Sequence, residues 1–149
     1  MQSQAQIHAL PQPIEQASPT SRTGLWIGRV LTGLTVAFMA FDAAGKLVMP
    51  SFVVDAFARL GFPTSLGPVI GIVLLAATVI YAIPRTSVLG AILLTGFLGG
   101  AVAIQMRAGS PLFETLFPAV FGMIAWAGIL LREGRLLALV PLRRRRSLA

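Results

Sequence analysis

The feature that most constrains this chain is a run of 19 residues without a charge, residues 88–106. Because an α-helix rises about 1.5 Å per residue, such a run is long enough to cross a hydrocarbon core of roughly 30 Å. Three similar apolar runs lie at residues 24–43, 64–83 and 112–131. Only 11% of the 149 residues are charged, against about a quarter in soluble proteins. We therefore predict an all-α membrane protein with four transmembrane helices in an up-down-up-down bundle.

The segments around these runs complete the predicted organisation. Residues 1–23 are rich in Gln, Ser and Pro and contain too few apolar side chains for a core, so we expect a disordered cytoplasmic leader. Residues 24–135 form the membrane domain. Within it, residues 51–60 place apolar side chains on one helical face but are too few to span, which predicts an interfacial amphipathic helix. Residues 136–149 contain four consecutive arginines, and we expect a cytoplasmic tail that binds anionic membrane lipid rather than nucleic acid.

The distribution of basic residues predicts how the spans are oriented. Four spans place both termini on the same side of the membrane, and nine of the twelve Lys and Arg residues lie on that side. Because loops rich in Lys and Arg stay in the cytoplasm, we predict a multi-pass protein of a bacterial-type inner membrane with both termini cytoplasmic. Tyr81 lies near the end of the run 64–83, and we expect it in the headgroup layer, where aromatic side chains concentrate.

Small residues recur at helical spacing in the runs 64–83 and 88–106. In lipid, burying apolar side chains gains little, so close packing of helix backbones is one of the main forces that hold helices together. We predict helix packing at five glycines: Gly67, Gly71, Gly96, Gly99 and Gly100. The alternative is that glycine is simply common in membrane helices.

Polar residues near the ends of the runs form a candidate site. The predicted topology brings the ends of the first and third runs to the same depth as the start of the fourth. That depth holds five polar residues: Asp42, Lys46, Gln105, Arg107 and Glu114. We predict a polar rim, where Lys46 and Arg107 donate hydrogen bonds to a quinone headgroup or a partner and Asp42 holds Lys46. The alternative is a ring of solvated interfacial charges.

The residue types present exclude several chemistries. Without cysteine, the chain can form no disulfide, no thiol redox centre and no iron–sulfur cluster held by thiolates. The only histidine, His8, precedes the first apolar run, so a haem between membrane histidines and a His-rich metal site are both excluded. We therefore predict no catalytic residues, no metal and no cofactor, and we expect that the chain is not an enzyme.

The run PRTSVLGAILLTGFLGGAVA, residues 84–103, followed by Arg107, resembles the signature of the DoxX-like family of small integral membrane proteins. The resemblance continues in the Arg-rich tail and at five single positions: Gly45, Lys46, Gly61, Pro63 and Trp126. Two positions depart from it. The resemblance leads us to expect a histidine near Gln105 and an acidic residue near Val73, and this chain has neither.

The resemblance implies a four-helix membrane fold and, from the better-known DoxX relatives, a small subunit associated with membrane oxidoreductases. The missing redox ligands and the recurring small residues favour the same role, a non-catalytic subunit or scaffold of a membrane complex, with a membrane or redox protein as partner. Self-association into a homo-oligomer stays open. The alternative is a small carrier or binding protein for a quinone or lipid-like molecule, because a four-helix bundle can hold an apolar ligand between its helices.

Overall fold

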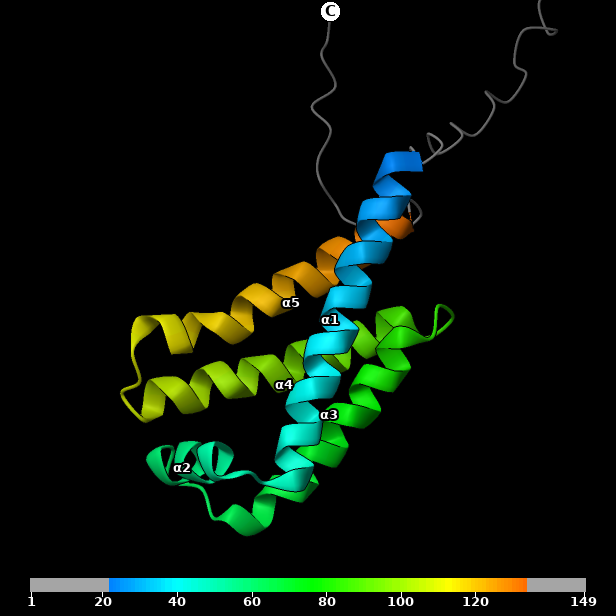
Figure 1. The fold of residues 1–149 in the computed structure, drawn as a ribbon. Helices are drawn as coiled ribbons and strands as arrows, with labels where there is room; N and C mark the ends of the chain where they lie inside the picture. Colours follow the sequence, from blue (N-terminus) through cyan, green and yellow to red (C-terminus); the bar gives the residue numbers. More distant parts are fainter. Residues whose placement is uncertain (1–21, 134–149) are drawn as a thin grey trace, which may run out of the picture.

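The computed structural model describes residues 22–133, and this part of the chain is helical without strands (Figure 1). Four of its helices are long and apolar enough to cross a membrane. They are α1 (Arg22–Val48), α3 (Gly67–Ala82, preceded by the 3-10 turn η1, Thr64–Leu66), α4 (Ser87–Arg107) and α5 (Leu112–Arg132). The prediction of an all-α chain with four such helices is confirmed. A fifth, short helix, α2 (Ser51–Arg59), lies between α1 and η1.

Helix α1 is longer at both ends than the predicted run 24–43. It takes in the last two residues of the predicted leader, whereas residues 1–21 and the predicted tail, 136–149, lie outside the described residues. At its other end the helix continues past Asp42 because Lys46 pairs with that carboxylate four residues along the same face.

Helix α1 ends where the backbone can no longer continue it. Met49 has a positive φ of 54°, the left-handed conformation that commonly follows a helix, and its amide donates a hydrogen bond to Gly45 O. Pro50 follows, and a proline cannot donate the next helical hydrogen bond. The chain is thereby turned out of α1 and into α2.

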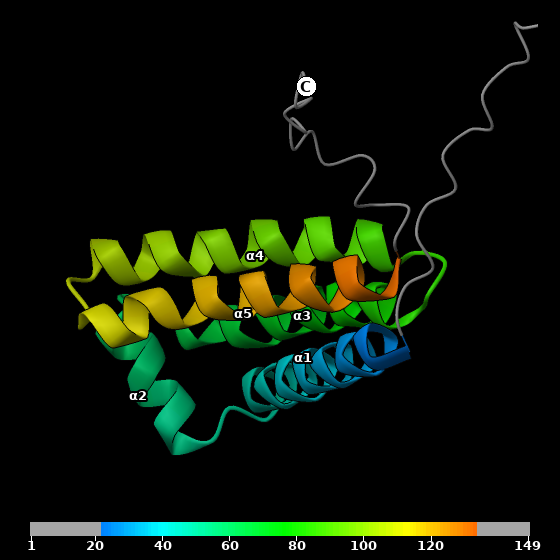
Figure 2. The same cartoon turned by 90° about the horizontal axis from the view of Figure 1, so that it is seen from above.

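The four long helices form a closed ring of contacts. Helices α1 and α4 each pack against both α3 and α5. Seen from above, α4 and α5 lie side by side, and α1 runs along the opposite side of the bundle (Figure 2). The shared core is made of small and medium apolar side chains from all four helices, with Leu74, Leu94 and Ile129 among the most deeply buried.

The helices are packed most tightly at one end, which we call the closed end: the start of α1 and α4 and the end of α3 and α5. A methyl group at Gly28 of α1 would lie only 2.9 Å from the carbonyl oxygen of Gly128 on α5. Beside this contact, Arg132 Nη1 donates a hydrogen bond to Thr32 Oγ1 at 3.2 Å. Glycine therefore lets α1 and α5 meet backbone to backbone, as membrane helices do where small residues face each other.

The side chain of Tyr81 points into the closed end of the bundle and not outward to lipid headgroups, whereas its depth in the membrane stays a prediction. Its side chain is 0% exposed, and its hydroxyl donates a hydrogen bond to the carbonyl oxygen of Ala125 at 2.9 Å. The bundle supplies both an apolar surround and an acceptor, which lets the tyrosine be buried without leaving its hydroxyl unpaired. Gly90 of α4 packs directly against the backbone of Tyr81 and joins α3 to α4.

At the opposite end, which we call the open end, α1 and α3 diverge from α4 and α5, and α2 lies across the gap (Figure 1). Only one residue of α2, Phe57, is buried. The two glycines predicted to pack at this end of α3 do so: methyl groups at Gly67 and Gly71 would lie 3.2 Å from Lys46 O and 3.1 Å from Ala43 O of α1.

The three glycines of α4 behave differently. A methyl group at Gly96, Gly99 or Gly100 would meet no heavy atom of the described residues within 4 Å. The prediction that they pack against another helix therefore fails within this chain, because α4 is not closely approached along that stretch. Instead, they border two hollows, which are described below.

Gly90→Ala is expected to lower the melting temperature of the protein in detergent. A methyl group at Gly90 would overlap the amide nitrogen and Cα atom of Tyr81, so α3 and α4 would have to separate. Overpacking of this kind costs about 1–3 kcal/mol of unfolding free energy. Gly33→Ala is the matched control, since a methyl group there would meet no described heavy atom within 4 Å. Equal melting temperatures for the two variants would contradict this account of the closed end.

Candidate functional site

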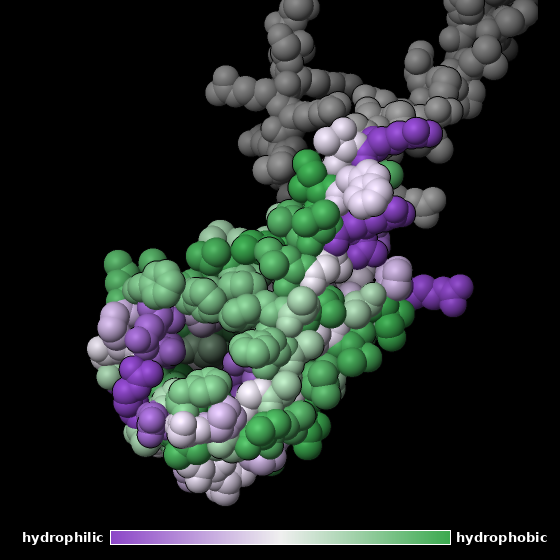
Figure 3. All heavy atoms as spheres, in the orientation of Figure 1, coloured by the Kyte–Doolittle hydropathy of each residue, from purple (hydrophilic) through white to green (hydrophobic). Residues whose placement is uncertain are grey.

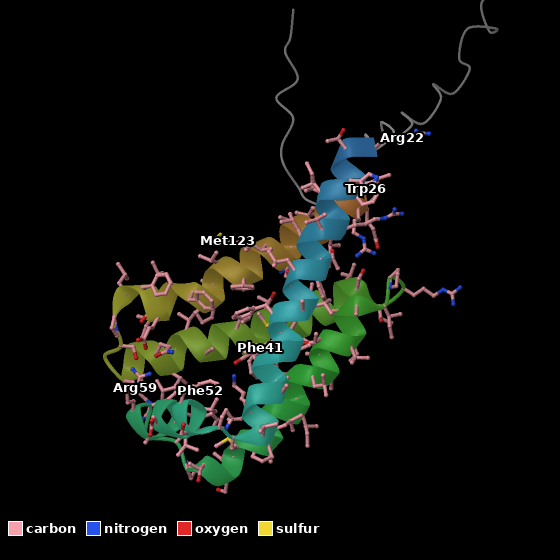
Figure 4. The ribbon with its side chains drawn as sticks, viewed as in Figure 1. Arg22, Trp26, Phe41, Phe52, Arg59 and Met123 are labelled. Atoms are coloured by element: carbon pink, nitrogen blue, oxygen red, sulfur yellow. The ribbon has the colours of Figure 1, made fainter. Side chains whose placement is uncertain are left out.

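A cavity of about 600 Å³ lies in the open end of the bundle. Its walls come from α1, α2, α4 and α5, from Ile70 of α3 and from the connection that follows α2. Figure 3 shows the hollow at this end, bordered mainly by hydrophobic side chains. Seven of the nine phenylalanines of the chain line it: Phe38, Phe57, Phe62, Phe97, Phe113, Phe117 and Phe121. The other two, Phe41 and Phe52, are exposed on the outside of the molecule (Figure 4). Phenylalanine is therefore concentrated at this one place.

One part of the lining is an aromatic wall between α1 and α5. Phe113, Phe117 and Phe121 recur every four residues and so lie on one face of α5. Phe38 of α1 stacks on Phe121 with ring centroids 4.1 Å apart, and it meets Phe117 edge-on at 5.4 Å. Aromatic pairs in these geometries hold one another in place, which gives the cavity a preformed apolar wall.

An ion pair from α1 supplies the charged part of the lining. Lys46 Nζ donates a hydrogen bond to Asp42 Oδ1, and both residues line the cavity. Their side chains are 19% and 38% exposed, respectively. The alternative of freely solvated charges therefore does not describe Lys46, whose ammonium lies against the apolar lining. Together the two residues add no net charge to the cavity.

Gln105 of α4 also lines the cavity, and its side-chain oxygen is unusual. Oε1 is buried and accepts no hydrogen bond from the described residues. Most buried polar side-chain atoms in native proteins do have a partner, so an exception calls for an explanation. Gln105 Oε1 is therefore a buried acceptor that no donor among the described residues pairs.

Glu114 lies at the edge of the cavity, where α5 begins. Its carboxylate oxygen is 3.8 Å from Arg59 Nη1, at the end of α2 (Figure 4). The arginine side chain is 68% exposed, and an exposed pair of this kind contributes at most about 1 kcal/mol. The pair links α2 to α5 only weakly.

Arg107 is the one predicted site residue that does not line the cavity. Its Nη2 donates a hydrogen bond to Leu60 O at 2.8 Å, and its guanidinium lies 5.9 Å from the ring centroid of Phe62. Leu60 and Phe62 do line the cavity. Arg107 therefore holds the connection between α2 and η1 beside the cavity, and its donation to a headgroup stays a prediction.

Four of the five predicted site residues thus line one cavity. The fifth, Arg107, lies outside the lining and contacts residues that belong to it. Sequence reasoning missed the phenylalanines, although the four-residue spacing along residues 113–121 was a signal for them. No group of three His, Cys, Asp or Glu side chains that could hold a metal ion occurs among residues 22–133.

A second hollow lies between α4 and α5 along another face of α4. Its volume is about 530 Å³, and its lining includes Gly99, Gly122 and Trp126. Trp126 Nε1 donates a hydrogen bond to Thr95 Oγ1 at 2.9 Å and so crosses from α5 to α4 at this groove. Small residues leave the helix backbones open here, while Gly96 and Gly100 face the phenylalanine-lined cavity.

Arg107→Ala is expected to increase hydrogen exchange in the connection between α2 and η1. The substitution removes the hydrogen bond to Leu60 O and the contact with Phe62, together about 1–2 kcal/mol, so local opening should increase about fivefold or more. Arg59→Ala removes only the weak pair with Glu114 and serves as the control. If both variants exchange like the wild type, Arg107 does not fasten this connection.

Comparison with known proteins places this architecture in a family. No curated protein and no solved structure gives a significant match to the chain. The sequence profile of the DoxX-like family matches residues 30–128, which is more than half of the chain and includes every residue that lines the phenylalanine-lined cavity. With its four apolar helices, the chain is a small multi-pass integral membrane protein that belongs to the DoxX-like family.

Proposed function

We propose that this protein binds a quinone or lipid-like molecule in the phenylalanine-lined cavity and acts as a small carrier or binding protein. The observation that supports this role is the cavity itself. Its volume of about 600 Å³ lies within the roughly 300–1,000 Å³ of small-molecule sites. Its lining is mainly apolar with a few polar groups, which is the usual composition of such sites. The cavity favours this role over the subunit role that the sequence suggested.

The proposed membrane placement gives the ligand a route. The short connections at residues 83–86 and 108–111 support an up-down-up-down crossing of the four long helices, with the open end at the outer side. Helix α2 then lies along the membrane surface as an interfacial helix, with Phe57 turned inward and Arg59 exposed. An apolar molecule would enter the cavity from the outer leaflet by passing beside α2. The connection between α2 and η1, which Arg107 holds, borders this entrance.

In this role the side chains hold a ligand and carry out no chemistry on it. The phenylalanine rings contact its apolar body and remove that surface from water and headgroups. The Asp42–Lys46 pair and Gln105 contact its polar end and fix its orientation in the cavity.

Filling the cavity is expected to expel the ligand. Gly100 lines the cavity and has free space at its Cβ position, so Gly100→Phe should place a ring inside and lower the amount of bound apolar molecule at least tenfold. Gly99→Phe is the matched control, since Gly99 has the same free space but borders the other groove. The measurement is native mass spectrometry of protein purified from membranes in mild detergent. Equal ligand retention in both variants, or no ligand in the wild type, would contradict the proposed role.

A second candidate is the non-catalytic subunit, and the groove at Gly99 is the observation that favours it. A groove lined by small residues between two helices fits a transmembrane helix of a partner, which would make close backbone contact there. The same two variants separate the roles. Loss of a crosslinked membrane partner in Gly99→Phe, with ligand retention unchanged, would support the subunit role.

The orientation is tested with single cysteines, because the chain has none of its own. Ser110→Cys lies in the connection between α4 and α5, and we expect a membrane-impermeant maleimide to label it from outside a bacterial cell. Ser147→Cys should be labelled only after the membrane is made permeable, because nine of the twelve basic residues lie on the terminal side. Labelling of Ser147→Cys in intact cells would reverse the proposed topology.

A further inference from the structure

The polar atoms of the cavity restrict the head group of the ligand, an inference that rests on the proposed function. Among the residues that line the cavity only Asp42, Lys46 and Glu114 are ionisable. The single cation, Lys46, is already paired with Asp42, and Glu114 adds a negative charge that Arg59 balances only in part. The cavity thus offers no unpaired positive charge.

This charge balance disfavours an anionic ligand. Arg107, the nearby cation that sequence reasoning assigned to a headgroup, lies outside the lining of the cavity, and its Nη2 donates a hydrogen bond to Leu60 O. A carboxylate or phosphate head would lose its hydration on binding and gain no free cation in exchange, and such an exchange is costly. A neutral head group does not incur that cost.

The hydrogen-bonding groups of the cavity further restrict the head group of the ligand. The Lys46 ammonium has three N–H donors, of which Asp42 takes one, so it can donate to an oxygen of a ligand. Gln105 Oε1 is an acceptor without a donor among the described residues. Rotation about χ3 exchanges Oε1 with Nε2 at small cost, so the amide can turn its oxygen toward the cavity. A ligand that supplies an O–H group would pair this acceptor.

We infer that, within the class proposed above, the ligand is a neutral apolar molecule whose head carries a hydroxyl group, as a quinol or a hydroxylated lipid does and a quinone does not. The hydroxyl oxygen accepts from Lys46, and its hydrogen is donated to Gln105. A hydroxyl is the smallest neutral group that does both. The phenylalanine wall suits an aromatic or long aliphatic body behind it. Gln105 is then the residue that distinguishes a hydroxyl head from one that only accepts hydrogen bonds.

Three matched probes test this inference: para-octylphenol, its methyl ether para-octylanisole, and para-octylbenzoate. Dissociation constants are measured for the full-length protein in nanodiscs of zwitterionic lipid, with empty nanodiscs as background. The wild type should bind the phenol about tenfold more tightly than the ether and should bind the benzoate most weakly. Gln105→Met, which keeps the side-chain length, should abolish the advantage of the phenol over the ether. Partition of each probe into lipid affects both proteins equally. It therefore cancels when the phenol-to-ether affinity ratio of the wild type is divided by that of Gln105→Met.

Two further variants complete the design. Asp42→Asn leaves the Lys46 charge without its partner, so the affinity for the benzoate should rise about tenfold relative to the phenol. Phe121→Leu alters only the apolar wall and should weaken all three probes to the same degree.

The outcomes separate this inference from the proposed function. A phenol-to-ether ratio that is the same in the wild type and in Gln105→Met overturns the hydroxyl assignment, as does tightest binding of the benzoate by the wild type. In either case saturable binding still supports a ligand site. If no probe binds saturably, the proposed function itself is overturned.

Discussion

The close backbone contacts at the closed end are the constraint on which the rest of the structure depends. Gly28 meets Gly128 between α1 and α5, and Gly90 meets Tyr81 between α4 and α3. In a membrane, where apolar burial drives helix association only weakly, such contacts must supply much of the attraction. Helices that touch at one end and cross at an angle separate at the other. The cavity is the direct result, and α2 occupies the gap that divergence leaves.

The chemistry of the open end follows from the same arrangement. Divergence exposes the inner faces of α1, α4 and α5 to one another across a space. Phenylalanines, three of them from α5, line this space together with small residues of α4 such as Gly96 and Gly100. Only a few polar side chains line the cavity among the phenylalanine rings. Because Asp42 neutralises Lys46, the space can lie at the end of a membrane bundle without a large desolvation cost for an isolated charge.

Sequence reasoning found the elements that depend on local pattern and failed where distant segments meet. The length of the apolar runs predicted the four long helices, and the four-residue spacing of Asp42 and Lys46 predicted their pairing. Whether a glycine packs depends on what lies opposite, so Gly71 met α1 whereas Gly96 met empty space. The contacts of Tyr81 and Arg107 could not be predicted for the same reason, since their partners, Ala125 and Leu60, are more than 40 residues away in the chain.

The uneven packing of the bundle also has a mechanical consequence. The helices contact one another closely at the closed end and are further apart at the open end. A lateral force on the open end would therefore displace the helices most around the cavity. Any displacement of the open end therefore changes the volume of the cavity, whereas backbone contact opposes movement at the closed end.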